Sequence, residues 1–266
     1  MKRIYAIALV LTLVGALAFA AGSKESVNTL TVGATPEPHA TFLNLIVDDL
    51  AAQGITLKVV EFTDYVTPNK ALEEGQIDAN FFQHIPYLES FNQEQGYHLA
   101  NAGGIHIEPI ALYSRKYASV DALPAGATIA IPNDPTNGGR ALLLLQSANL
   151  ITLSADAGIT ATVFDIVSNP KNLKFREIEA ASLPRVLADV DAAVINGNYA
   201  LPAGLKANQD GLVIEGADSP YVNVVAVRQG SENDPAIKAL VKALQSQKIK
   251  DYVNKTYLNG EVVVVF

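Results

Sequence analysis

The sequence predicts an α/β protein of two lobes, each with a parallel or mixed sheet flanked by helices. Three observations support this. Short β-rich runs alternate with segments of helical apolar spacing, which favours a sheet covered by helices. The alternation runs through residues 30–82 and starts again near residue 128, and a clearly amphipathic helix follows near residue 235. A chain of 266 residues is long enough for two such units, each with its own core.

The first unit contains five expected elements that alternate between strand and helix. In order, they cover residues 30–34, 40–52, 55–62, 69–74 and 77–82. In the first helix, Phe42, Leu45 and Ile46 follow helical spacing, and Gly54 ends the segment.

The second unit repeats the strand–helix order. Its expected elements cover residues 128–132, 139–150, 173–178, 183–188 and 192–195. The last helix begins at Pro235, and Ile237, Leu240 and Leu244 lie on its apolar face, which we expect to pack on the first lobe. The chain would then cross between the lobes twice, near 107–113 and near 221–227. Residues 30–110 and 226–266 would form lobe 1, and residues 111–225 would form lobe 2.

The N-terminus has the features of an export signal. Lys2 and Arg3 precede an apolar run over 4–17, and residues 18–20 read AFA, the small-x-small pattern of a cleavage site. The alternative, a retained membrane anchor, is disfavoured because the run is short and polar residues follow it. We expect a signal peptide over 1–20 and a linker over 21–29. The protein would be exported, to the periplasm or elsewhere in the cell envelope.

Composition and motifs exclude several classes of protein. A net charge of −8 disfavours nucleic-acid binding. The chain has no cysteine, which excludes disulfides, thiolate metal sites and thiol nucleophiles. No catalytic motif is present, so we expect a binding protein rather than an enzyme, with no cofactor. Only His106 and Glu108 have metal-like spacing among the scattered histidines, so no metal site is expected.

Aromatic and imidazole side chains follow the expected strands of the first unit. In open α/β sheets, ligands bind beyond the carboxyl ends of the strands. Aromatic rings with polar tips suit a soft apolar side chain, because sulfur packs well against ring edges. Ordinary core packing is the alternative. The residues concerned are Phe62, Tyr65, Phe82, His84 and Tyr87.

Polar candidates follow two strands of the second unit. After residues 128–132, the turn containing Asn133 leads to a helix start, a place where backbone N–H groups attract anions. Arg140 could clamp a carboxylate there; the alternative is a helix capped by Asn137 with a surface arginine. Asn196 and Asn198 could bind an ammonium and a carboxylate together, or form a plain Asn-Gly turn. The remaining candidate, in the second crossing, is Asn223.

These segments resemble the MetQ/NlpA family of methionine-binding proteins, the substrate-binding subunits of methionine ABC importers. The likeness runs from about residue 29 to about residue 262, and several independent motifs occur in the right order. The motifs are VEFTDYV at 60–66, NFFQH at 80–84, AIPNDPTN at 130–137, LPR at 183–185, AVINGNY at 193–199 and SPYVN at 219–223.

The resemblance implies a type II periplasmic-binding-protein fold that closes on L-methionine and delivers it to a membrane-embedded methionine ABC permease. It implies that the five aromatic and histidine candidates surround the thioether. Arg140 would hold the carboxylate, and Asn133, Asn196 and Asn223 would bind the amino and carboxylate groups. We expect a monomer. Alternative ligands are another small apolar amino acid or a methionine-containing peptide; alternative classes are a metal-binding and a surface-adhesion protein.

The sequence departs from this family just after the signal peptide. Members are usually lipoproteins anchored through a cysteine at that position. Here residues 20–23 read AAGS, so a lipid anchor is in doubt.

Overall fold

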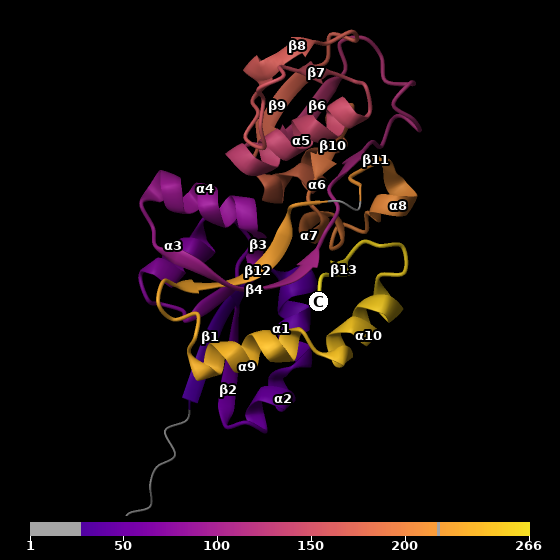
Figure 1. Ribbon diagram of the computed structural model, residues 1–266. Coiled ribbons are helices and arrows are strands. Elements are labelled where there is room, and N and C mark those ends of the chain that lie inside the picture. The colour runs from indigo at the N-terminus through magenta and orange to yellow at the C-terminus, as the bar shows by residue number, and fades with distance from the viewer. Residues whose placement is uncertain (1–27, 217–218) are drawn as a thin grey trace, which may run out of the picture.

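The computed structural model describes residues 28–216 and 219–266. The expected signal peptide and nearly all of the linker lie outside these ranges. The described chain forms two α/β bodies, each built on its own sheet (Figure 1). The described helices are all too short or too polar to cross a membrane.

The first body has a six-stranded mixed sheet in the order β13-β4-β12-β3-β1-β2. Strand β1 pairs in parallel with β2 and β3, whereas β12 runs antiparallel to both β3 and β4. The strands are β1 (Asn28–Ala34), β2 (Ile55–Glu61), β3 (Ala79–His84), β4 (Leu99–Ile107), β12 (Val222–Arg228) and β13 (Val263–Val264).

Helices cover both faces of this sheet. Its central strand β12 shows why: Val225 and Val227 face one apolar cluster, and Val224 and Ala226 face another, following the two-residue period of a strand. The helices are α1 (Thr41–Leu45), α2 (Val47–Ala51), α3 (Thr67–Glu73), α4 (Ile85–Gln95), α9 (Pro235–Leu244) and α10 (Gln247–Thr256), with a π-helical turn, η1 (Pro36–Ala40).

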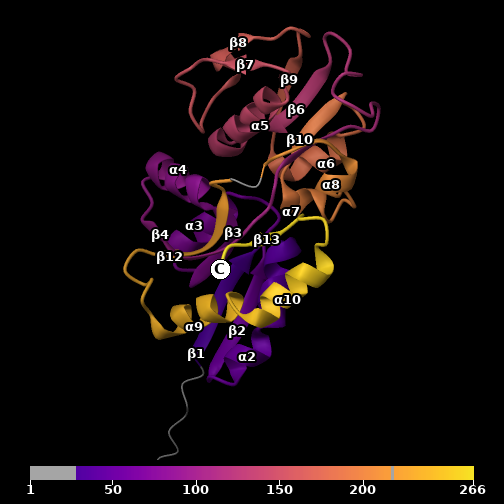
Figure 2. The same ribbon diagram turned by 45° about the vertical axis from the view of Figure 1, so that its right-hand side comes forward.

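Two predictions about these helices have opposite outcomes. Helix α9 packs on the first lobe as expected, with Ile237, Leu240 and Leu244 buried in the core that contains β1 and β2 (Figures 1 and 2). The single helix expected over 40–52 is wrong. The chain instead breaks at Ile46, where φ −104° and ψ 5° leave the helical region and separate α1 from α2.

The second body has a five-stranded sheet in the order β11-β5-β10-β6-β9, also covered on both faces. Its strands are β5 (Ala111–Tyr113), β6 (Thr128–Pro132), β9 (Lys174–Ile178), β10 (Ala192–Ile195) and β11 (Gly211–Ile214). A small two-stranded sheet pairs β7 (Thr152–Leu153) with β8 (Ile166–Ser168). The helices are α5 (Pro135–Ser147), α6 (Leu183–Val186), α7 (Gly197–Ala200) and α8 (Ala207–Asp210), with 3-10 turns η2 (Val163–Asp165) and η3 (Ala180–Ser182).

Helix α5 begins four residues before the predicted start at residue 139. Asp134 is its N-cap, because the Oδ1 of Asp134 accepts the backbone N–H of Asn137 at 2.9 Å. Asn137 is therefore not the cap, which removes that alternative. The helix also lies very close to a neighbouring loop: a Cβ on Gly139 would be 2.2 Å from the carbonyl oxygen of Ile159.

The two sheets are connected twice. The first connection, residues 108–110, joins β4 to β5, and the second runs from the end of β11 to the start of β12. After each crossing the new strand inserts antiparallel between two strands of the sheet it enters: β5 between β10 and β11, and β12 between β3 and β4. Because β12 pairs within the first sheet from Val222 onward, the second crossing ends before the predicted lobe boundary at residues 225 and 226.

Candidate functional site

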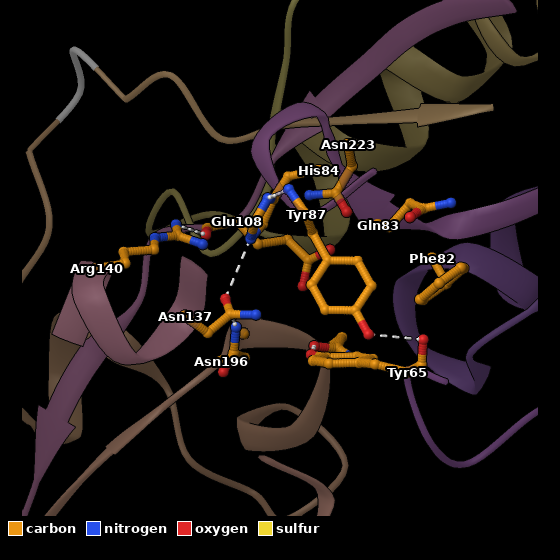
Figure 3. A pocket seen from close by; sticks show the side chains of 12 residues that line it. Tyr65, Phe82, Gln83, His84, Tyr87, Glu108, Asn137, Arg140, Asn196 and Asn223 are labelled. Atoms are coloured by element: carbon orange, nitrogen blue, oxygen red, sulfur yellow. Dashed lines mark hydrogen bonds between the residues drawn. The ribbon is translucent and has the colours of Figure 1, made fainter. Parts of the chain in front are cut away.

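A pocket lies between the two lobes, at the carboxyl ends of β3, β6 and β10 (Figure 3). Its empty volume is about 330 Å³, part of which is open to solvent. Its lining residues are Tyr65, Phe82, Gln83, His84, Tyr87, Glu108, Asn137, Arg140, Asn196, Gly197, Asn198 and Asn223.

All of the predicted site residues line this pocket except Phe62 and Asn133. The ring of Phe62 turns toward the sheet and lies beneath Gly33, where a Cβ would be 2.7 Å from the ring. Asn133 directly precedes the N-cap of α5, and its side chain is exposed and does not line the pocket. A position just after a strand thus places a residue near the pocket without deciding which way its side chain points.

One side of the pocket is aromatic. The ring of Tyr65 lies 5.9 Å from that of Phe82 and 5.8 Å from that of Tyr87, measured between centroids. The hydroxyl of Tyr87 donates to the backbone oxygen of Tyr65 at 2.9 Å, which fixes the two relative to each other. Such a group of rings offers a flexible apolar chain, and sulfur above all, a preformed surface.

His84 connects this aromatic side to the other lobe. Its Nδ1 accepts the backbone N–H of Tyr87 at 3.1 Å, so we assign the ring proton to Nε2, which donates to the Oδ1 of Asn137 at 3.1 Å. Burial, and then the nearby Arg140 guanidinium, lower the pKa of His84 to about 3. The imidazole is therefore neutral at physiological pH and acts as a hydrogen-bond donor.

Arg140 is buried rather than on the surface, with only 3% of the residue exposed. Its Nε donates to Glu215 at 2.8 Å, and its Nη2 donates to Glu215 and, at 2.8 Å, to the backbone oxygen of Glu108. The guanidinium also stacks on Tyr221, 4.1 Å from the ring centroid. Among the described residues no hydrogen bond uses Nη1, so this nitrogen can receive a further acceptor.

Direct hydrogen bonds hold the two lobes together around the pocket. The hydroxyl of Tyr65 donates to the Oδ1 of Asn198 at 2.5 Å, and the hydroxyl of Tyr199 donates to the backbone oxygen of Thr63 at 3.1 Å. The bond between His84 and Asn137 is a third. The structure is therefore a closed form.

Buried polar atoms without a partner gather in this pocket. Glu108 Oε2, Asn196 Oδ1 and Asn198 Nδ2 have no hydrogen bond in the described part of the chain, and all three residues line the pocket. The second polar atom of each asparagine side chain already has a hydrogen bond: Asn196 Nδ2 donates to Asn137 Oδ1 at 2.7 Å, and Asn198 Oδ1 accepts the hydroxyl of Tyr65. Because buried polar groups are nearly always paired, these atoms indicate a polar ligand.

Four lining residues were not among the predicted site residues. Gln83, Asn137 and Gly197 lie inside motifs that the sequence had singled out, so the signal was present for them. Gln83 is held by two hydrogen bonds between its side-chain amide and that of Asn69, at 2.8 and 2.7 Å. Glu108 lies in the first crossing, and only its spacing from His106 drew attention to it.

The structure adds a third residue to that pair. The donor atoms of His39, His106 and Glu108 lie within 4.8 Å of one another, a spacing at which such groups can also hold a metal ion. Here His106 Nε2 lies 2.8 Å from Glu108 Oε1, His39 Nε2 lies 3.4 Å from the same oxygen, and we assign the three residues no metal.

Comparison with known proteins identifies the family. A family model described as NlpA lipoprotein matches residues 30–266. The chain belongs to the NlpA lipoprotein family. Its relatives include the membrane lipoprotein TpN32 of Treponema pallidum, 47% identical over 88% of this chain and 87% of that protein. The D-methionine-binding lipoprotein MetQ of Escherichia coli is 46% identical over 79% of this chain and 78% of that protein.

Solved structures of NlpA relatives share the fold. One is a nutrient binding protein from Burkholderia cenocepacia bound to methionine, which is 48% identical to this chain. It matches with a TM-score of 0.85 over 89% of this chain and 100% of that one. The lipoprotein Tp32 from Treponema pallidum matches with a TM-score of 0.87, 46% identity, and coverage of 89% and 99%. The predicted α/β fold with two mixed sheets flanked by helices is confirmed.

Proposed function

We propose that this protein is the extracytoplasmic substrate-binding component of an ABC importer and that methionine is its ligand. The observation that carries the proposal is the composition of the pocket between the lobes. Aromatic rings form one side, and a buried arginine with unpaired amide groups forms the other. A zwitterion with a soft apolar side chain complements both sides, because it fills the apolar part and pairs the polar atoms.

The individual contacts follow from the free atoms. Arg140 Nη1 and Asn198 Nδ2 are donors, which suit the ligand carboxylate, and Asn196 Oδ1 is an acceptor, which suits the ammonium. The thioether would lie against Phe82 and Tyr87, since these rings define the apolar end. Asn223 has its Oδ1 occupied by His39 Nε2 at 3.2 Å, so its Nδ2 would face the ligand as a donor.

The named relatives support methionine. MetQ of Escherichia coli is named as D-methionine-binding, and the Burkholderia cenocepacia protein was solved with methionine bound. We expect L-methionine to be the ligand of this chain, and titration of both enantiomers tests that choice.

Transport would depend on closure of the lobes. Ligand bound to both lobes stabilises the closed form, and only a ligand with differential affinity for that form can shift the population toward it. A membrane-embedded permease would recognise the closed form. We propose further that the protein works as a monomer in the cell envelope and catalyses no reaction; its family relatives are named as lipoproteins.

The test is calorimetric titration of L-methionine into protein that has been unfolded, dialysed and refolded, because a closed pocket can retain ligand through purification. We expect saturable binding of one ligand per chain. Norleucine, leucine, glutamine and glycyl-methionine form the competition series, since one methylene is worth only about 1–3 kcal/mol of discrimination. Absence of heat with methionine in a cooperatively melting sample would refute the proposal. Tighter binding of one of the competitors would make that compound, rather than methionine, the proposed ligand.

A further inference from the structure

Glu108 is a buried carboxyl group at the base of the pocket. It belongs to the first crossing, only 5% of the residue is exposed, and it lines the pocket. Its two oxygens have different surroundings. Oε1 lies 2.8 Å from His106 Nε2 and 3.4 Å from His39 Nε2, whereas Oε2 has no hydrogen-bond partner among the described residues.

The two imidazoles orient this carboxyl group without neutralising it. Burial lowers the pKa of His39 to about 4 and that of His106 to about 3, so both rings are neutral at physiological pH. Thr35 Oγ1 lies 2.8 Å from His39 Nδ1 and can donate to it, which leaves the His39 proton on Nε2, where it donates to Asn223 Oδ1 at 3.2 Å. His106 Nε2–H donates to Oε1 of Glu108, and Oε2 takes no hydrogen bond from either imidazole.

No described cation is free to pair with Glu108. Arg140 from α5 reaches only its backbone oxygen, and the charge of that guanidinium is already matched by Glu215. Glu37 from η1 adds a repulsive negative charge, and the phenols of Tyr65 and Tyr257 are also close enough to interact with Glu108. Burial raises the pKa of Glu108 to about 7; His39, Arg140 and the backbone N–H of Asn198 act in the opposite direction but do not cancel it.

We propose that Glu108 is the counter-ion of the ligand's α-ammonium, which pairs with Oε2, and that this residue makes a free amino group a requirement of the site. The inference rests on the proposed function and specifies how the site recognises the amino group of its ligand. Gly197 leaves room for the Glu108 side chain, because a Cβ there would lie 2.9 Å from the Cβ of Glu108 and 3.0 Å from Oε2. The unpaired Asn196 Oδ1 supplies a second acceptor for the same ammonium.

A charged pair in a buried site should discriminate far more strongly than a neutral one. An analogue without the amino group leaves Oε2 of Glu108 without a hydrogen bond and the buried carboxyl group without a counter-ion. The ammonium of methionine would supply both the hydrogen bond and the opposite charge. Removing the charge from Glu108 should therefore penalise methionine specifically. Binding of an analogue that lacks the amino group should change little.

The experiment compares the wild type, E108Q and the control E89Q, using calorimetry with methionine and with 4-(methylsulfanyl)butanoate, its desamino analogue. Glu89 lies on α4 of the same lobe, is exposed and does not line the pocket. We expect the wild type and E89Q to prefer methionine by about 100-fold or more, and E108Q to lose most of that preference, about 30-fold, on the scale of a charged hydrogen bond. Affinity for the analogue should stay within about threefold.

Each outcome has one meaning. An unchanged preference in folded E108Q, or equal affinity of the wild type for both compounds, overturns the role of Glu108 while methionine binding stands. Failure of the wild type to bind methionine overturns the proposed function instead.

A measurement on the wild type covers the case in which E108Q does not fold. Affinity for methionine should fall roughly tenfold from pH 8 to pH 6, because Glu108 with a pKa of about 7 must lose a proton before it pairs with an ammonium. Affinity for the desamino analogue should remain flat over that range. Parallel pH profiles for the two compounds would overturn the inference.

Discussion

Replacing Arg140 with alanine tests the polar side of the pocket most directly. The guanidinium is held by Glu215 and by the backbone of Glu108, and it stacks on Tyr221, so its orientation is fixed before any ligand arrives. Nη1 is the donor that remains for a carboxylate. The variant Arg140→Ala removes that donor and its charge from a site that is almost fully desolvated.

The size of the effect follows from this burial. Loss of a charged hydrogen bond in a desolvated site costs about 2–4 kcal/mol, which corresponds to roughly 30- to 900-fold weaker binding of methionine. Stability should fall as well, by about 3 kcal/mol, since Glu215 loses the partner of a largely buried ion pair. That value is at the low end of the usual range because the Glu215 side chain keeps 15% of its exposure.

Calorimetry would measure the affinity, and urea unfolding would measure the stability. The matched control is Arg185→Ala, because Arg185 lies in the same lobe but is exposed and bonds only to Ser182. It should change neither quantity by more than about 0.5 kcal/mol. Methionine affinity of Arg140→Ala within threefold of the wild type would refute the assignment of Arg140 to the ligand carboxylate.

Three further predictions concern packing, closure and acid stability. Gly139→Ala should destabilise the fold by about 1–3 kcal/mol in urea unfolding, because the new methyl group meets the carbonyl oxygen of Ile159. The control Gly158→Ala should not destabilise it, because a Cβ there has nothing within 4 Å. Equal losses of stability in the two variants would contradict this reasoning. Tyr65→Phe should weaken methionine binding about 5- to 30-fold in calorimetry, because the closed form loses the bond to Asn198; unchanged affinity would show that this bond does not stabilise closure. The three buried histidines have lowered pKa values, so the unfolded chain binds more protons below pH 6.5 and stability should fall from pH 7 to pH 5. Glu108, whose pKa is raised, acts in the opposite direction over this range, so the net loss in urea titrations should be about 3 kcal/mol, and a flat profile would contradict the reasoning.

Strands were predictable where an apolar run has clear ends. The expected strands at residues 128–132 and 192–195 coincide with β6 and β10, because both are buried on two faces and therefore read as continuous apolar segments. The break at Ile46 was not predictable, since the apolar spacing continues through it. The start of α5 was misjudged because Asp134, rather than Asn137, supplies the cap.

The site was predictable to the extent that its residues follow strands. Tyr65, Phe82 and His84 could be selected because strand ends gather at one edge of a sheet. Phe62 satisfied the same rule, yet its ring packs inward under Gly33. Glu108 could not be selected, because its burial depends on residues from distant parts of the chain, and no local pattern records that they meet there.

The attachment of Arg140 has a mechanical consequence. One of its hydrogen bonds goes to the backbone of the first crossing, at Glu108, and its ion pair goes to Glu215, which begins the second crossing. The residue that would hold the ligand is thus tied to both segments about which the lobes must turn. If the lobes were separated, the crossings would twist and the guanidinium would move away from the ligand carboxylate. Opening of the lobes and release of the ligand would then be a single movement. A transporter would need only to separate the lobes and would not have to bind the amino acid more tightly than this protein does.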